Sequence, residues 1–224
     1  MNAHPTVVVP TYNDDERLSL LLPTLANHGL RVVVVDGQVS SHTRALVAAH
    51  DMIYLVSKPG RGQQIDTALR CVTADWVWIL HADSVVSDQC VQRLQEVVAA
   101  GSPCWGRFDV RIAGLGLIAA MMNLRSRWTR ICTGDQGMFF ATELLEQAGG
   151  FPAQPLVEDI ELSKRLKRAA HDGFLACSEQ LQTSARRWQQ QGVVRTVLTM
   201  WTYRLRYWCG ADPDVLYQRY YGSH

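Results

Sequence analysis

A histidine and an aspartate follow directly after one of the most apolar runs of the chain. The apolar run Trp76–Leu80 is followed by His81-Ala82-Asp83. A buried strand would therefore place a carboxylate at a ligand site. In open α/β sheets the ligand crevice lies beyond the carboxyl ends of the strands. Asp83 is therefore a candidate ligand for a divalent cation or a hydroxyl group. The alternative is that Asp83 or Ser84 only caps the following helix, Ser87–Ala99, by accepting hydrogen bonds from its first N–H groups.

A second acid stands in the equivalent place after another predicted strand. Arg31–Val35 runs into Asp36-Gly37, so two strand ends offer Asp36 and Asp83 to one edge of a sheet. An acid at this edge can accept hydrogen bonds from a ribose or a base, while another can hold the metal ion that bridges a diphosphate. The two acids together indicate such a site more strongly than either does alone.

Glycine-rich phosphate loops are missing where dinucleotide-binding and P-loop proteins have them. The first strand ends in Pro10-Thr11-Tyr12-Asn13, and neither G-x-G-x-x-G nor the P-loop signature follows it. Sites of those two kinds are therefore disfavoured. Gly60-Arg61-Gly62 follows a different strand and predicts a loop that brings Arg61 or Lys58 near a phosphate group. The alternative is a plain surface turn.

Two adjacent acids open a helix in the second half of the chain. Leu156–Leu162 contains Glu158-Asp159 and leads into four basic residues. Acids at the start and bases towards the end suit the helix dipole, so stability alone could explain this order. Adjacent helical residues point about 100° apart. We therefore expect one of the two acids to face a pocket and the other to act as a cap.

Short β-branched runs alternate with longer amphipathic segments through the first hundred residues, which predicts a parallel sheet with crossover helices. After Pro103 the pattern is mixed, but no repeat or low-complexity linker divides the chain. The second half should therefore complete the same core. The predicted strands are Thr6–Val9, Arg31–Val35, Met52–Val56, Trp76–Leu80, Trp105–Ile112 and Gly137–Ala141, and the predicted helices are Asp14–Asn27, Ser41–Ala49, Gln63–Val72, Ser87–Ala99, Leu115–Arg127 and Val193–Trp208.

The composition favours a single domain without a strong overall charge. Of the 224 residues 47% are hydrophobic, and 22 Lys plus Arg stand against 21 Asp plus Glu. No global field attracts nucleic acid or an anionic membrane, so partners have to be read from local features. The six cysteines lack metal-binding spacing and no secretory signal precedes the first strand, which predicts a cytoplasmic protein with reduced thiols. The apolar stretch Ile112–Leu124 is too short to span a bilayer.

Six motifs occur in a characteristic order: Pro10-Thr11-Tyr12-Asn13, Asp36-Gly37, His81-Ala82-Asp83, Gly134-Asp135-Gln136-Gly137, Glu158-Asp159 and Arg186-Arg187-Trp188. In this order and approximate spacing they resemble glycosyltransferase family 2, which has the GT-A fold. The resemblance covers nearly the whole chain, and its specificity lies in the ordered set. More narrowly, the leucine-histidine-alanine-aspartate strand end and the loop Thr133–Gly137 are similar to the radical-SAM/selenodomain-associated transferase 2 subgroup.

The resemblance implies an α/β GT-A fold, Rossmann-like, with a mostly parallel mixed sheet flanked by helices. It implies a single domain over residues 1–224, with a nucleotide-binding half at about 1–101 and an acceptor half at about 102–224. The implied activity is hexosyltransferase-like: a sugar moves with inversion from a nucleotide-diphospho-sugar to an acceptor hydroxyl. The implied cofactor is a divalent cation, Mn²⁺ or Mg²⁺.

The same resemblance gives roles to individual residues. It implies that Asp159 is the general base, that Asp36 contacts the nucleoside and that Asp83 holds the metal ion. An acceptor hydroxyl is a poor nucleophile until a carboxylate takes its proton, and the leaving diphosphate needs its growing charge neutralised. The other expected contacts are Pro10, Tyr12, Asn13, Arg61 and Arg187 on the donor side, His81 as a secondary metal ligand, and Asp135, Gln136 and Glu158 on the acceptor side.

Three positions depart from the family's pattern. His81 stands where many relatives have the first acid of the metal motif, and a neutral imidazole can bind Mn²⁺ but suits Mg²⁺ poorly. Gln38-Val39-Ser40-Ser41 lacks the second acid common after the second strand. Ser184 replaces the glutamine of the Q-x-x-R-W motif of processive relatives, so we expect a single transfer rather than polymer synthesis.

Apolar residues recur at helical spacing in Val193–Trp208. Most such stripes are core, and core is the expectation here. The alternative is that this helix, together with Leu115–Met122, contacts a lipid-linked acceptor, a membrane surface or a partner subunit in a homo-oligomer.

Two other functions fit part of the pattern. A nucleotidyltransferase would use similarly placed acids, but its phosphate nucleophile is already anionic and needs no base. A non-catalytic module that binds sugar nucleotides would explain why His81 and Ser41 replace expected acids. Such a module would bind donor without turnover.

Overall fold

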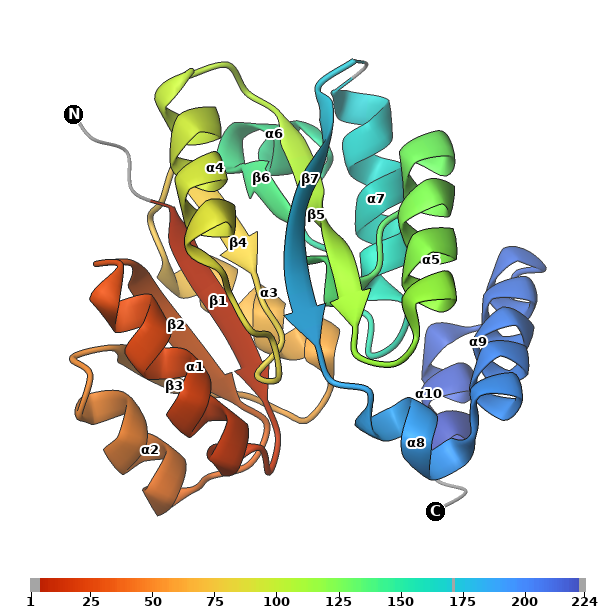
Figure 1. The fold of residues 1–224 in the computed structure, drawn as a ribbon, viewed down its shortest axis with the longest axis horizontal. Coiled ribbons are helices and arrows are strands. Elements are labelled where there is room, and N and C mark those ends of the chain that lie inside the picture. Colours follow the sequence, from red (N-terminus) through yellow and green to blue (C-terminus); the bar gives the residue numbers. More distant parts are fainter. Residues whose placement is uncertain (1–4, 171, 222–224) are drawn as a thin grey trace.

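Seven strands form one sheet at the centre of the computed structural model, which describes residues 5–170 and 172–221 (Figure 1). The strands are β1 (Thr6–Thr11), β2 (Arg31–Asp36), β3 (Ile53–Val56), β4 (Trp76–Ile79), β5 (Trp105–Ile112), β6 (Phe139–Ala141) and β7 (Phe174–Thr183). The helices are α1 (Asp15–Asn27), α2 (Ser41–Ala48), α3 (Arg61–Cys71), α4 (Asp88–Ala99), α5 (Gly116–Thr129), α6 (Thr142–Gln147), α7 (Glu158–Ala169), α8 (Arg186–Gln191), α9 (Val193–Trp208) and α10 (Pro213–Tyr221), with a 3-10 turn η1 (Gly134–Gln136). Across the sheet the order is β3-β2-β1-β4-β6-β5-β7.

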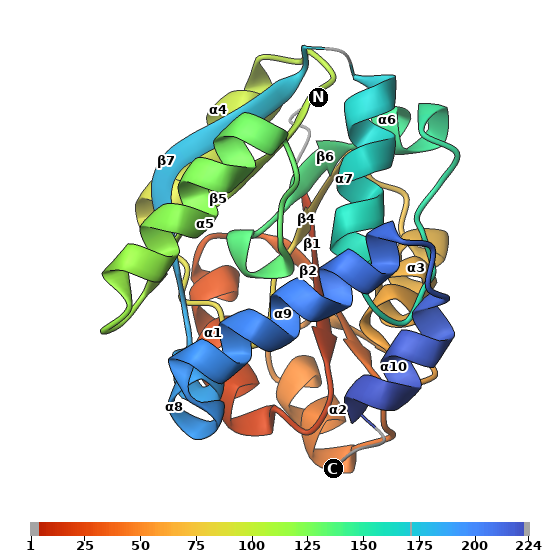
Figure 2. The ribbon, with the colours of Figure 1, turned by 90° about the vertical axis from the view of Figure 1, so that its right-hand side faces the viewer.

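The first half of the sheet is parallel and buried. β1 pairs with β2 and with β4, and β2 pairs with β3, all in parallel. Helices α1 and α4 lie on one face of the sheet and α3 and α7 on the other (Figures 1 and 2). The valine runs of β1 and β2 are therefore buried on both sides, as in other covered parallel sheets. The carboxyl ends of β1, β2 and β4 meet at one edge.

The second half of the sheet reverses direction. β6 is antiparallel to both β4 and β5, and β7 pairs with β5 in parallel. The rings of Trp78, Phe108 and Phe139 meet at this junction, with centroids 5.5 Å apart in each neighbouring pair. This aromatic contact joins the two halves into one core. The mixed, mostly parallel sheet confirms the predicted α/β fold class.

The predicted elements match the observed ones to within two residues at each end, but β7 was not predicted. β7 lies at the edge of the sheet, and only three of its residues, Cys177, Leu181 and Thr183, are buried. An edge strand with so few buried positions lacks the clear alternation that marks a half-buried strand. The short helices α6, α8 and α10 were missed as well.

The loop prediction for Gly60-Arg61-Gly62 is wrong. Arg61 is the first residue of α3, and Gly60 precedes it with φ 128°, a conformation that favours glycine. A Cβ on Gly62 would lie 2.0 Å from the carbonyl oxygen of Gln154. The glycines therefore allow the start of α3 to approach another backbone segment.

The core prediction for the apolar stripe of α9 is also wrong. The helix has the predicted bounds, but Trp201, Leu205 and Trp208 are each more than half exposed. Val197 and Met200, on a neighbouring side of the helix, pack instead against a small apolar cluster that includes Trp188. None of the described helices is long and apolar enough to cross a membrane.

One buried side chain ties the ends of β1 and β2 together. The amide nitrogen of Gln64, on α3, donates to the carbonyl oxygens of Thr11 at 2.6 Å and Val35 at 2.8 Å. Both bonds are buried, so the glutamine holds two strand ends and a helix in fixed relative positions. These strand ends carry the residues expected at the site.

Replacing Gln64 with leucine should destabilise the protein. The leucine has a similar size but removes two buried hydrogen bonds, so we expect a loss of about 1–3 kcal/mol in the free energy of unfolding, measured in urea. Gln63→Leu, one residue earlier on α3, is the matched control because its side chain makes no hydrogen bond within the described part of the chain. Similar stability losses in both variants would contradict the role of the amide.

Candidate active site

Asp36 ends β2 and is almost completely buried. Its Oδ1 accepts a hydrogen bond from the Gln38 N–H at 3.0 Å, and its Oδ2 accepts one from the Tyr54 hydroxyl at 3.0 Å. Each carboxylate oxygen can accept a second bond, so the arrangement fixes the group and still leaves lone pairs for a ligand. Tyr54, on β3, was not singled out from the sequence.

The end of β1 lies beside Asp36. Thr11 and Asp36 are register partners, and the following residue, Tyr12, is half exposed. A Cβ on Gly37 would lie 3.1 Å from the Tyr12 ring, so the ring covers this turn. Asn13 has φ 52°, which redirects the chain into α1. Pro10 is buried inside β1 and pairs with Val35, so its expected direct contact with a donor is at odds with the structure.

Asp83 follows β4 and is paired with an arginine. The Arg17 Nη1 lies 3.0 Å from Asp83 Oδ2, and both side chains are about one-fifth exposed. Arg17 comes from the first turns of α1, and its spacing to Asp83 in the chain gave no indication of the contact. The ion pair therefore places a guanidinium group beside the carboxylate that follows this strand.

His81 follows β4, and its side chain lies near the η1 turn. Its Nδ1 lies 4.0 Å from Asp135 Oδ1. Among the described residues, no group of three or more His, Cys, Asp or Glu side chains has the arrangement of a metal site. A cation bound mainly by substrate phosphates needs only one or two protein carboxylates, and the Asp83 carboxylate can supply one of them.

Gln136 is fully buried, and its side chain makes hydrogen bonds that stabilise the η1 turn. Its Oε1 accepts a hydrogen bond from the Thr133 N–H at 3.1 Å, and its amide donates to the Ser126 hydroxyl at 2.9 Å. The expectation that Gln136 contacts an acceptor directly is therefore corrected, because its side chain is used inside the protein. Asp135, the residue before Gln136, is about one-third exposed.

Glu158 and Asp159 line one small cavity between η1, α3 and β4. The expectation that only one of them faces a pocket is wrong, because the cavity lies against the N-terminal end of α7 and both residues of its first turn border it. Neither acts as an N-cap through its side chain. The lining consists of Arg61, Ile65, Ile79, Gly134, Met138, Phe151, Glu158, Asp159 and Leu162.

Specific contacts hold both carboxylates in place. Glu158 Oε1 lies 3.3 Å from Arg61 Nε. Asp159 Oδ2 accepts a hydrogen bond from the Gly134 N–H at 3.0 Å, and its Oδ1 accepts one from the Ile160 N–H at 2.7 Å. A Cβ on Gly134 would lie 2.0 Å from the Arg61 guanidinium. Only glycine therefore lets the arginine reach the acids.

Burial changes the acidity of this pair. It raises the pKa of Glu158 to about 7, against the opposing effect of Arg61, and the neighbouring Asp159 raises it further. Burial also raises the pKa of Asp159, while Arg61 and the N–H groups of Gly134 and Ile160 act to lower it. Arg125, on α5, interacts electrostatically with Asp159 and was missed in the sequence.

The contacts join most of the predicted site. Asp159 binds the backbone of Gly134, Asp135 follows Gly134 directly, and His81 lies near Asp135. Asp83 stands two residues after His81. Asp36 belongs to β2, which is separated from β4 by β1 alone. The backbone of Arg187 is in α8, but its side chain lies outside the described part of the structure. The common cleft for all three acids stays a prediction.

The fold and this arrangement define a GT-A type protein, and the sequence gives the family. The profile of glycosyl transferase family 2 matches residues 6–151. The chain belongs to this family. None of the curated proteins matches the chain.

Several solved structures share the fold. The fragment 1–349 of TarS of S. aureus, in complex with UDP-GlcNAc, has a TM-score of 0.65 and 20% identity, over 81% of this chain and 58% of that fragment. The mannosyltransferase PcManGT of Pyrobaculum calidifontis, with GDP-Man and Mn²⁺, has a TM-score of 0.60 and 24% identity, over 81% of this chain and 57% of that protein. Glucosyl-3-phosphoglycerate synthase of Mycobacterium tuberculosis, with Mn²⁺, UDP and glucosyl-3-phosphoglycerate, has a TM-score of 0.59 and 15% identity, over 81% and 71%. This chain thus spans less than two thirds of the first two proteins.

The raised pKa of Glu158 should make stability depend on pH. The unfolded chain loses this proton near pH 4.5, whereas the folded protein holds it until about pH 7. The unfolded state therefore binds fewer protons in this window, and stability falls as the pH rises through it. Glu158→Gln removes that loss. Between pH 4.5 and about pH 8 we expect the free energy of unfolding of this variant to rise relative to wild type by up to about 3 kcal/mol.

The control is Glu161→Gln on the same helix. Burial alone would raise the pKa of Glu161, but hydrogen bonds from Tyr207 and Arg165 lower it overall. Glu161 in the folded protein therefore titrates below this pH window. The free energy of unfolding of Glu161→Gln, relative to wild type, should not change with pH across the window. Parallel curves for wild type and Glu158→Gln would rule out a proton held by Glu158.

Proposed function

We propose that this protein is an inverting, hexosyltransferase-like glycosyltransferase that moves a sugar from a nucleotide-diphospho-sugar to an acceptor hydroxyl. The observation that carries the proposal is the partly buried Asp159 carboxylate, which borders a cavity between η1 and β4 and has a raised pKa. Membership of family 2 supports the reaction class. The structures similar in fold include complexes with UDP-GlcNAc and GDP-Man.

In this proposal Asp159 is the general base. The proton of the acceptor hydroxyl passes to its carboxylate, and the acceptor oxygen forms a bond to the anomeric carbon. The bond from that carbon to the diphosphate oxygen breaks at the same time, and its electron pair leaves on the nucleoside diphosphate. Attack from the side opposite the leaving group inverts the anomeric centre. The Arg61 guanidinium and the Gly134 N–H favour the ionised form of the base that this step needs.

Asp83 would hold the divalent cation, with His81 as a secondary ligand. The cation, when bound, neutralises the growing charge of the departing diphosphate. Two of the similar structures contain Mn²⁺, and an imidazole ligand favours Mn²⁺ over Mg²⁺. Arg17, 3.0 Å from Asp83, adds a fixed positive charge for the same diphosphate.

The nucleoside would lie against the ends of β1 and β2. Asp36 is proposed to accept hydrogen bonds from it, and the half-exposed Tyr12 ring to pack on the base, with Asn13 at the rim. Arg187 is proposed to add a donor to the diphosphate. Arg61, expected on the diphosphate, is proposed instead to control the charge of the acid pair because it lies against Glu158.

On the acceptor side we propose Asp135 and Glu158 as hydrogen-bonding groups and Gln136 as a positioning residue for the η1 turn. The nucleotide-binding half would run to about residue 101 and the acceptor half from 102 onward. The narrower resemblance to the radical-SAM/selenodomain-associated transferase 2 subgroup rests on the two short motifs alone and stays a proposal.

Asp159→Asn should abolish transfer and spare donor binding. The amide keeps the shape of the carboxylate but cannot take the acceptor's proton, so we expect a 10²–10⁴-fold loss of kcat. The assay follows nucleoside diphosphate release over a panel of UDP- and GDP-sugars, with donor affinity measured by calorimetry. Asp66→Asn, an acid on α3 outside the cavity, serves as control. Undiminished turnover in Asp159→Asn would remove the proposed base.

Asp83→Ala should weaken donor binding that depends on metal. We expect at least a tenfold loss of affinity for the donor in the presence of Mn²⁺, and little change when the metal is chelated. Asp14→Ala is the control, because Asp14 also lies near Arg17, at 3.8 Å, but stands at the N-cap of α1 and is not a proposed metal ligand. Equal losses in both variants would attribute the effect to Arg17 rather than to a metal ligand. Wild-type protein that binds donor and never transfers it would favour the non-catalytic module.

A further inference from the structure

Helix α5 presents an apolar stripe to solvent. Leu117, Met121, Leu124 and Trp128 follow one another at intervals of four, three and four residues, and each is between 53% and 81% exposed. This spacing places the four side chains on one face of the helix. The opposite face, with Ala119 and Met122, packs on the protein.

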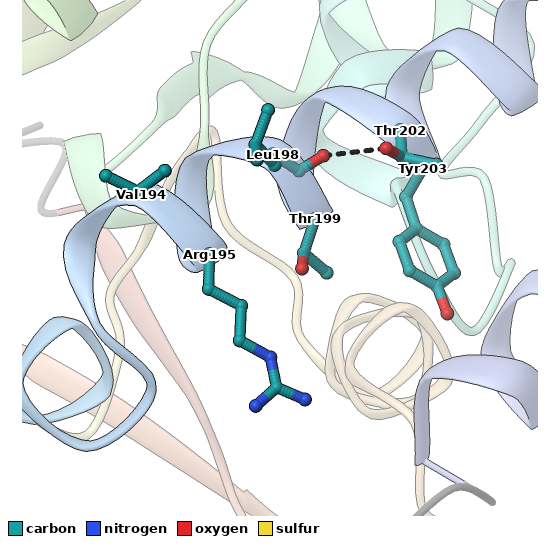
Figure 3. A pocket seen from close by; sticks show the side chains of 6 residues that line it. All are labelled: Val194, Arg195, Leu198, Thr199, Thr202 and Tyr203. Carbon is teal, nitrogen blue, oxygen red and sulfur yellow. Dashed lines mark hydrogen bonds between the residues drawn. The ribbon is translucent and has the colours of Figure 1, made fainter.

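Helix α9 repeats the pattern over a longer span. Val194, Leu198, Trp201, Leu205 and Trp208 recur at intervals of four, three, four and three residues and are between 55% and 72% exposed. In Figure 3 the side chains of Val194 and Leu198 extend on one side of the helix, while Arg195, Thr199 and Tyr203 extend on the other. The outer surface of α9 is therefore divided into an apolar stripe and a flanking polar side.

The two helices belong to the same side of the molecule. Both face the viewer in Figure 2, and a shared apolar cluster lies beneath them. Ile118, Ala119 and Met122 of α5 enter this cluster together with Val197 and Met200 of α9. We refer to the exposed residues of the two stripes as the α5–α9 surface.

The two segments that carry the α5–α9 surface are rich in arginine. Residues 110–134 contain four arginines and residues 180–211 contain five, and neither segment has an acidic residue. The whole chain has a net charge of only +1, so the remainder carries an excess of eight acids. Arg127 and Arg130 pair with acids from outside the first segment. Among the described residues, no ion pair involves the three arginines of α9, Arg195, Arg204 and Arg206.

We propose that the α5–α9 surface docks on an anionic lipid membrane. Apolar and tryptophan side chains on one side of a helix, flanked by arginine, are what binding in the headgroup region requires: the stripe enters the acyl boundary and the guanidinium groups meet lipid phosphates. A second copy of the chain fits poorly, because a two-fold contact would bring the same acid-free, arginine-rich segments together. The net charge of the whole chain is thus close to zero, although the two segments that carry this surface are basic.

This docking has a structural link to the acid cavity. α5 leads within four residues to Thr133, which caps the η1 turn, and Arg125 of α5 interacts electrostatically with Asp159. The helix that would contact the membrane therefore also carries a charge that acts on Asp159. The docking proposal itself does not depend on the proposed enzymatic activity.

Vesicle sedimentation tests the proposal. Wild-type protein should bind vesicles of phosphatidylglycerol mixed with phosphatidylcholine, and bind vesicles of phosphatidylcholine alone at least tenfold more weakly. Leu124→Ser/Trp128→Ser/Trp201→Ser should reduce the partition to the anionic vesicles by at least about tenfold. Leu20→Ser/Val39→Ser, at comparably exposed apolar positions away from α5 and α9, should bind like wild type.

A second pair of variants tests the charge. Arg195→Gln/Arg206→Gln should weaken binding to the anionic vesicles by roughly 25-fold, whereas Arg31→Gln/Arg70→Gln, also exposed but on β2 and α3, should not. Circular dichroism establishes that each variant is folded. The proposal is overturned if wild type ignores both vesicles, if it binds neutral and anionic vesicles equally, or if ultracentrifugation shows a dimer that the tryptophan variants dissociate without any vesicle binding.

Discussion

Two adjacent carboxylates at the start of α7, Glu158 buried and Asp159 partly buried, lie near the guanidinium of Arg61, and the rest of the site depends on this constraint. Burial opposes ionisation of both acids, and Arg61 opposes that effect. The arginine reaches the pair only because residue 134 lacks a side chain. A loop, two helices and a strand are thereby held around a carboxylate whose pKa is raised by burial, which is a property expected of a general base.

The sheet determines which groups can act with that carboxylate. Parallel pairing of β2, β1 and β4 gathers Asp36, Tyr12 and Asp83 at one edge, and Gln64 fixes the first two strand ends. The reversal at β6 lets the η1 turn return to the end of β4, where Asp135 lies near His81. The proposed nucleotide side and the proposed acceptor side are therefore adjacent because one half of the sheet is parallel and the other is mixed.

Much of this framework could be predicted from the sequence, since strongly apolar strands alternate with amphipathic helices and the acids stand at their ends. The prediction from the sequence failed for side chains whose contacts and burial depend on residues distant in the chain. The pairing of Arg17 with Asp83 and the burial of Gln136 result from tertiary packing. The stripe of α9 has the period of a core helix, and only the fold reveals that nothing in the described chain covers it.

A crystal structure with a nucleotide-diphospho-sugar and Mn²⁺, taken from a panel of UDP- and GDP-sugars, tests the central claim most directly. The account predicts an anomalous manganese signal beside Asp83, a nucleoside against Asp36 and Tyr12, and the anomeric carbon facing Asp159 across the space for an acceptor. A donor bound away from these strand ends, or one whose sugar lies out of reach of Asp159, would contradict it.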